Sequence, residues 1–128
     1  MNILLDTHTF LWWITDMPKL SQTARELIGD GHNTIYWSAA SSWEVSIKYA
    51  LGRLPLPEAP EIFLPSEIAQ NRVEPLPIID LHSFRAGQLP RHHRDPFDRM
   101  LVAQAQVESL VLLTNDQKLS LYDVEVQW

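Results

Sequence analysis

Hydrophobic positions along the chain alternate between short continuous runs and stripes with helical spacing. The runs are rich in Leu, Ile, Val and aromatic residues, and they predict five short strands at residues 2–6, 33–38, 72–78, 110–114 and 124–128. The segments between them predict helices at residues 7–16, 20–31, 39–52, 80–89, 96–108 and 116–121. Residues 53–65 contain Pro55, Pro57, Pro60 and Pro65, which predicts a connector with room for one helical segment after it.

This alternation of strands and helices predicts an α/β fold with a largely parallel sheet. The length of 128 residues suits one hydrophobic core, and no repeat or low-complexity tract divides it. We therefore expect a single domain over residues 1–128.

Composition narrows the functional classes. No apolar run approaches the ~18 residues of a membrane span. Asp6 interrupts the apolar N-terminal segment, which makes it a poor signal peptide. The absence of cysteine excludes thiolate chemistry and fits a cytoplasmic location. The net charge of −6 is unusual for a nucleic-acid binder, so any such activity must depend on local cationic side chains or recruited cations.

Three acids stand where a strand ends or a helix begins. Asp6 and Asp116 each follow an apolar run, a position at which an acid also serves as the N-cap of the next helix. Asp98 falls in the first turn of a helix that Asp95 and Pro96 begin, where the helix dipole alone favours an acid. Structural roles therefore explain each of these acids when it is considered alone.

Glu44 is the fourth acid, and its helical environment is unusual. It shares one stripe with Ala40, Ile47 and Leu51, and a carboxylate on an apolar stripe is costly unless it is paired, protonated or bound to a cation. An ion pair with Lys48, four residues later, is the structural alternative.

The joint placement of these acids points to a metal site. Parallel strands bring their carboxyl ends to one edge of a sheet, and the two helix acids can reach the same edge. Four crowded carboxylates repel one another, and a divalent cation removes that repulsion. Oxygen ligands select Mg²⁺ or Mn²⁺, ions that support hydrolysis of phosphodiester bonds.

Four stretches of the chain resemble, in order and spacing, the motifs of the PIN-domain nucleases and most closely those of VapC-like toxins from type II toxin–antitoxin pairs. They are LLDTH (residues 4–8), WSAASSWEVSIK (37–48), HRDPFDRMLVAQA (93–105) and LLTND (112–116). The resemblance implies a three-layer sandwich with a mostly parallel sheet of four to five short strands and helices on both faces. It also implies an endoribonuclease that forms a homodimer and is inhibited by an antitoxin segment lying across its active-site groove.

The resemblance also assigns roles to residues. It implies that the catalytic acids, which bind Mg²⁺ or Mn²⁺, are Asp6, Glu44, Asp98 and Asp116. Asp95 belongs to a D-P-F-D-R variant of the third motif, and Thr114 matches a hydroxyl residue that often accompanies the last acid; Thr7 is a further supporting residue.

Cationic and aromatic residues near these motifs are candidates for contact with RNA. Arg99 adjoins Asp98, and Arg94, Lys48 and His8 are further candidates, although solvated surface side chains or structural hydrogen bonds explain them equally simply. Trp12 and Trp13 lie in a segment that is apolar on nearly every side, so core burial, an interface and base stacking all remain open.

The stretch RHHRDPFDRM, residues 91–100, also resembles a His–Asp site for a transition metal. We expect instead that Asp98 is the ligand, that Asp95 and Pro96 start its helix, and that Arg91, His92, His93 and Arg94 form a cationic rim for RNA.

The sequence offers three alternatives to a nuclease: a phosphatase, a protein with a nucleotide cofactor and a PIN fold used only for binding. A phosphatase with Asp6 as covalent nucleophile would normally need a second acid at the position of His8. A nucleotide cofactor is poorly supported because the four glycines form no phosphate-binding loop. The absence of one of the four acids would favour a PIN fold that is used only for binding, and none of the four is absent.

Overall fold

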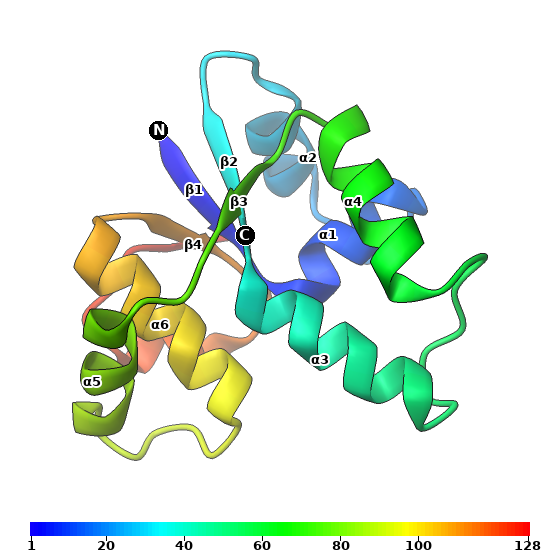
Figure 1. The fold of residues 1–128 in the computed structure, drawn as a ribbon. Coiled ribbons are helices and arrows are strands. Elements are labelled where there is room, and N and C mark those ends of the chain that lie inside the picture. Colours follow the sequence, from blue (N-terminus) through cyan, green and yellow to red (C-terminus); the bar gives the residue numbers. More distant parts are fainter.

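The computed structural model describes residues 1–128 and contains one five-stranded sheet with the order β3-β2-β1-β4-β5. All four strand pairings are parallel (Figure 1). The strands are β1 (Asn2–Leu5), β2 (Thr34–Ser38), β3 (Glu74–Leu76), β4 (Val111–Leu113) and β5 (Val126–Gln127). All five predicted strands are therefore present, although each is shorter than or equal to its predicted range.

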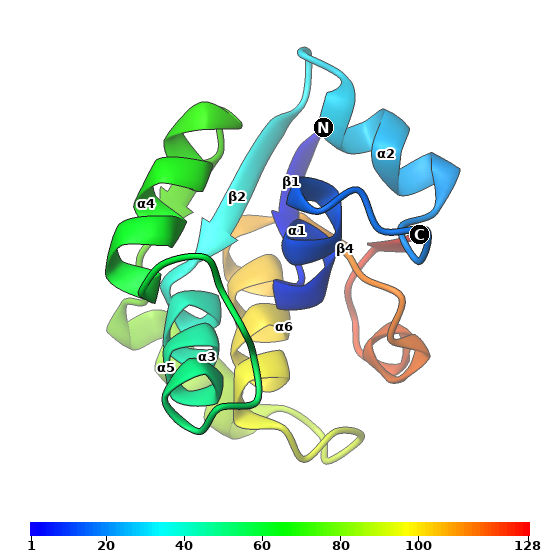
Figure 2. The same cartoon turned by 90° about the vertical axis from the view of Figure 1, so that its right-hand side faces the viewer.

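Helices cover both faces of the sheet, as the prediction of a three-layer α/β sandwich requires (Figures 1 and 2). The helices are α1 (Thr7–Ile14), α2 (Gln22–Gly29), α3 (Ala39–Ala50), α4 (Pro60–Gln70), α5 (Asp80–Gln88), α6 (Pro96–Glu108) and the 3₁₀ helix η1 (Gln117–Leu121). None of them combines the length and the apolar character that crossing a bilayer would require.

Side chains that alternate along the strands divide the core between the two faces. Ile3 and Leu5 of β1 pack with α1, α2 and α4, whereas Leu4 packs with α6 and η1. This alternation follows from the two-residue period of a strand. Because both faces of the sheet are covered, the central strands are continuous apolar runs in the sequence.

Prolines produce the main difference between the predicted and observed elements. Helix α4 begins at Pro60 within the predicted connector and continues through Pro65. Pro60 is tolerated in the first turn because amides there have no helical partner, but Pro65 removes one internal hydrogen bond. Leu64, which is 3% exposed in the core, supplies packing that favours the helix despite this loss. Strand β3 similarly contains Pro75, which an edge strand tolerates.

The strand order places β1 beside β4 at the centre of the sheet. From β1 the chain extends the sheet through β2 and β3 in one direction, and β4 and β5 extend it in the other. The amide of Asp6 donates to the carbonyl of Leu113 at 3.1 Å, so the carboxyl ends of the two strands are joined directly. Ligands of open α/β sheets bind at such a reversal of strand order.

Candidate active site

Asp6 lies at the carboxyl end of β1, in the N-cap position of α1, yet its side chain caps no amide of that helix. Its Oδ2 instead accepts a hydrogen bond of 2.6 Å from Thr114 Oγ1. Thr114 Oγ1 also accepts from the amide of Asp116 at 3.1 Å. The hydroxyl of Thr114 therefore links the acids that follow β1 and β4, and capping does not account for the carboxylate of Asp6.

Glu44 is buried in α3 at 4% exposure, with a partner for each carboxylate oxygen. Thr7 donates to its Oε1 at 2.7 Å, and Lys48 donates to its Oε2 at 2.6 Å. The ion pair and the burial that the sequence offered as alternatives therefore occur together. The apolar stripe that the sequence suggested is not buried along its whole length, since Ile47 and Leu51 are 37% and 61% exposed.

Asp98 stands in the first turn of α6, on the face that carries the buried Val102. Asp95 Oδ1 accepts from the amides of Phe97 at 2.8 Å and of Asp98 at 3.4 Å. Asp95 is thus the N-cap and Pro96 the first helical residue, as predicted. Because Asp95 caps the helix, the carboxylate of Asp98 is free to face the other acids.

The carboxyls of Asp98 and Asp6 are both perturbed. The pKa of Asp98 is raised to about 8, first by burial and then by the charges of four neighbouring acids, Asp6, Asp95, Glu44 and Asp116. Burial also raises the pKa of Asp6, against the opposing effects of the Thr114 hydrogen bond and the charge of His8. Both shifts come first from burial and, for Asp98 above all, next from repulsion among the acids, which a bound cation would offset.

His93 lies among these acids and also lines a hollow with Arg91 and Arg94, its predicted neighbours on the cationic rim. Its Nε2 is 2.9 Å from Asp116 Oδ2 and 3.1 Å from Asp98 Oδ2. These three residues can place one ligand atom each within 4.8 Å of one another. The sequence contained the signal, a histidine two residues before the helix cap, but the adjacent arginines suggested a surface role. Ser41, 2.8 Å from Thr7 Oγ1, carried no recognisable signal at all.

Arg99 has a different environment from the one that its position beside Asp98 suggests. Its guanidinium donates to the carbonyls of residues that precede α6: Ala86, Leu89, Pro90 and His93. Arg99 therefore anchors the segment that precedes α6, with both terminal guanidinium nitrogens bonded to main-chain carbonyls. Arg94 and Arg91 are exposed, and with His93 and Arg99 they line a hollow of about 590 Å³.

Trp12 and Trp13 are partly buried, so neither belongs fully to the core. Trp12 packs edge-on against Trp128, with Lys19 over its ring, and His8 stacks on it at 5.9 Å. Trp12 and His8 also line an apolar groove of about 290 Å³. Trp13 points the other way and donates from Nε1 to Asn71 at 3.0 Å.

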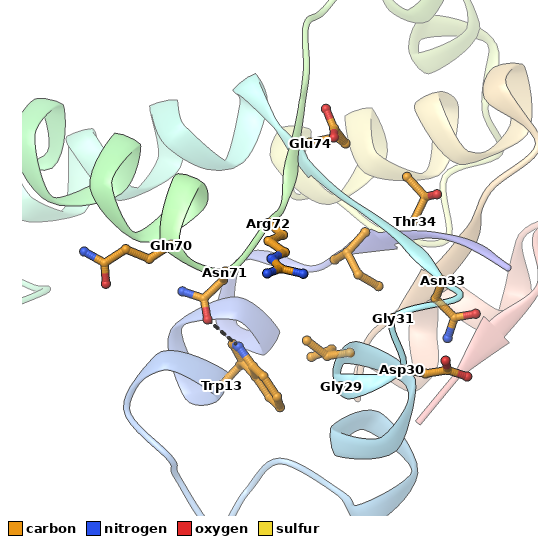
Figure 3. Close-up of a pocket in the computed structure, with 12 residues that line it drawn as sticks. Trp13, Gly29, Asp30, Gly31, Asn33, Thr34, Gln70, Asn71, Arg72 and Glu74 are labelled. Atoms are coloured by element: carbon orange, nitrogen blue, oxygen red, sulfur yellow. Dashed lines mark hydrogen bonds between the residues drawn. The ribbon is translucent and has the colours of Figure 1, made fainter.

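Figure 3 shows a second cavity, of about 400 Å³, to which Trp13 contributes. It lies where β2 and β3 begin, with Thr34 and Glu74 in its lining, and so occupies the opposite edge of the sheet from the acids. Arg72 is the only cationic residue that lines the cavity, and the acidic residues Asp30 and Glu74 line it as well. The cavity therefore has no part in the acidic site.

The sequence model of the PIN domain matches residues 3–125. The chain belongs to the PIN domain family. Ribonuclease VapC16 of Mycobacterium tuberculosis (strain ATCC 25618 / H37Rv) is 36% identical over 70 residues, a match that spans 52% of this chain and only half of that protein.

Solved toxin–antitoxin structures share the PIN fold of this chain. The VapBC2 structure from Rickettsia felis, bound to a DNA fragment from its promoter, has a TM-score of 0.72 at 19% identity and covers 99% of this chain and 98% of that one. The DNA-bound VapBC structure from Salmonella typhimurium has a TM-score of 0.73 at 20% identity, with 99% and 97% covered. At these identities the likeness concerns the fold.

The raised pKa of Asp98 predicts how the stability of this PIN domain depends on pH without metal. The folded state holds a proton on Asp98 more tightly than the unfolded chain, whose aspartate pKa is about 4. The free energy of unfolding should therefore fall from about pH 4 to about pH 8, by at most about 1.4 kcal/mol per pH unit for this group. Asp98→Asn should reduce that slope, measured by urea unfolding in EDTA.

Asp123→Asn, at an exposed position, is the matched control and should keep the wild-type slope. An unchanged slope in Asp98→Asn would show that the carboxyl is not perturbed. Strong destabilisation of that variant at every pH would instead assign Asp98 to helix capping.

The contacts of Arg99 predict a structural role that urea unfolding can measure. Arg99→Ala removes hydrogen bonds from a charged donor to four carbonyls and should lower the free energy of unfolding by about 1–3 kcal/mol. Arg94→Ala, at an exposed position, should change it by about 0.5 kcal/mol or less. Equal stability of the two variants would contradict this role.

Proposed function

We propose that this PIN domain is a metal-dependent endoribonuclease that acts in the cytoplasm as the toxin of a type II toxin–antitoxin pair. The observation that carries the proposal is the gathering of Asp6, Glu44, Asp98 and Asp116 where β1 and β4 end. Membership of the PIN domain family and the partial match to a protein named a ribonuclease support it.

The donor set of this site fits Mg²⁺ or Mn²⁺. The four acids would hold the ion, and their donors are carboxylate oxygens, the ligands that hard divalent cations prefer. The raised pKa of Asp98 reflects negative charge that a cation would balance. When bound, the ion would supply a Lewis acid that activates water and balances charge on the phosphodiester.

The chain's own residues would keep these carboxylates in place during hydrolysis. Thr114 fixes Asp6, while Thr7 and Lys48 fix the two oxygens of Glu44. Because these partners are hydrogen-bond donors, they orient the carboxylates without needing to move when substrate binds. Such fixed polar groups cost no reorganisation at the moment of reaction.

RNA would approach from the loop that precedes α6. Arg91 and Arg94 are exposed there and line one hollow with His93. They would bind backbone phosphates, and His8, exposed two residues after Asp6, would lie at the other border of the site. This local positive charge would offset the net charge of −6, which otherwise repels RNA.

Cleavage of RNA tests the proposal directly. Wild type should cleave RNA with Mg²⁺ or Mn²⁺ and stop when EDTA is added. Asp6→Asn removes one negative ligand and should lower the cleavage rate at least about 100-fold, whereas the exposed Asp123→Asn should retain it. Cleavage by Asp6→Asn at the wild-type rate would sink the mechanism, and inactivity of metal-loaded wild type would favour a domain used only for binding.

The same variants separate toxicity from the burden of expression in bacteria. Wild type and Asp123→Asn should slow growth, while Asp6→Asn at equal abundance should not. Normal growth with abundant folded wild type would count against a toxin.

An antitoxin segment would bind in the apolar groove beside the acids. The lining includes His8, which is exposed two residues from Asp6, so an occupant of the groove would lie close to the acidic site. Its other side chains come from α1, α4 and the segment between α3 and α4, and they are mainly apolar: Leu11, Trp12, Ile14, Leu54, Leu56 and Phe63. Aromatic and aliphatic pockets of this kind anchor partner side chains.

We also propose that the domain forms a homodimer through α3 and α5, which lie on one side of the molecule (Figure 2). These helices carry large apolar side chains in solvent: Trp43, Leu51, Leu81 and Phe84 are each more than half exposed. Exposed apolar groups on one side of a molecule are typical of an interface.

Sedimentation velocity tests the homodimer. Wild type should sediment as a dimer, and Phe84→Glu should be a monomer because it places a charge in the apolar interface. Leu121→Glu, at a residue of η1 that is 62% exposed, should remain dimeric. A monomeric wild type, or a dimeric Phe84→Glu, would contradict the proposed interface.

A further inference from the structure

The imidazole of His93 is held from several sides, although neither the sequence nor the proposed mechanism gives it a task at the acids. Its backbone amide donates to Tyr122 Oη at 2.9 Å, and its side chain is 14% exposed. Its Nδ1 accepts a hydrogen bond of 3.0 Å from the amide of Asp95, the cap of α6. The ring is therefore fixed relative to the helix that carries Asp98.

The bond from Asp95 decides which nitrogen of His93 carries the proton. A backbone amide only donates, so Nδ1 must present its lone pair to it. In a neutral imidazole the proton then resides on Nε2, the nitrogen that faces Asp116 Oδ2 at 2.9 Å and Asp98 Oδ2 at 3.1 Å. A nitrogen that carries a proton has no lone pair for a metal ion.

We infer that His93 is a positioning residue whose Nε2–H donates to Asp116 and lies against Asp98, which keeps the two carboxylates together for the ion without ligating it. This inference rests on the proposed metal-dependent function. Each carboxylate oxygen has two lone pairs, so accepting from Nε2 leaves both acids able to bind a cation.

The two acids come from separate parts of the chain, which is why such a link matters. Asp98 belongs to α6, and Asp116 follows β4 and accepts from the amide of Lys118 at 3.0 Å. Their carboxylates repel, and His93 Nε2 lies between them, hydrogen-bonded to Asp116 Oδ2 at 2.9 Å and 3.1 Å from Asp98 Oδ2. Hydrogen-bond partners of metal ligands commonly change metal affinity about 10–100-fold when removed.

Two substitutions test the donor role of Nε2 and the acceptor role of Nδ1 in His93 separately. The amide nitrogen of His93→Gln reaches about as far as Nε2 and restores the donor, whereas the oxygen of His93→Asn replaces only the acceptor at Nδ1. We expect the dissociation constant for Mn²⁺, measured by calorimetry, to rise about 10-fold or more in His93→Asn and to stay within about threefold of wild type in His93→Gln. His92→Asn, which alters the adjacent imidazole against Tyr122, should bind as wild type does.

The outcomes distinguish this inference from the function on which it rests. If wild type binds no Mn²⁺ and cleaves no RNA, the proposed function fails and the inference fails with it. If wild type binds Mn²⁺ and His93→Asn binds it equally well, only the inference fails. A fold control is urea unfolding in EDTA, in which all three variants should remain cooperatively folded.

Pulsed electron paramagnetic resonance of bound Mn²⁺ tests the tautomer separately. A positioning role predicts no coupling to a directly ligating histidine nitrogen in wild type. Such a coupling, if present in wild type and absent in His93→Gln, would make His93 a ligand and overturn the inference.

Discussion

Repulsion among four buried or partly buried acids is the constraint around which this end of the molecule is organised. The sheet brings Asp6 and Asp116 to adjacent strand ends, and α3 and α6 add Glu44 and Asp98. Asp6, Glu44 and Asp116 each have a hydrogen-bond donor on the carboxylate, among them hydroxyls, an ammonium group and an imidazole, and the same imidazole lies 3.1 Å from Asp98. The protein thus maintains an arrangement that is unfavourable by itself and that a cation would make favourable.

The segment before α6 gathers several of these contacts. Arg99 binds its carbonyls, Asp95 caps the helix and orients His93, and Tyr122 accepts from the amide of His93. A short stretch therefore couples helix capping, loop conformation and carboxylate placement. A substitution there acts on the site through geometry even where the side chain never reaches substrate.

The pattern of apolar runs and helical stripes predicted the strands, most helices and the α/β class with a parallel sheet, because strands that are buried on both faces are continuous apolar runs. The family resemblance implied the three-layer arrangement. The prediction failed at Pro65, where packing of Leu64 outweighs a lost hydrogen bond. The main-chain contacts of Arg99 and His93 were not predicted, because adjacency in sequence does not reveal which side chains turn back onto the backbone. For Glu44, the sequence offered the ion pair with Lys48 and burial as alternatives, and only the structure shows both.

The two margins of the sheet limit how copies of this chain can associate. Strand β3 contains Pro75, which lacks an amide hydrogen, and β5 has only two residues. Neither margin offers the long row of free amides and carbonyls on which a foreign strand could add. Strand addition from one copy to the next, the route to amyloid-like deposits, is thereby discouraged in a chain whose central strands β1 and β4 are largely apolar. Association through the helical surfaces remains open to the chain, and it can stop at a closed oligomer such as the proposed dimer.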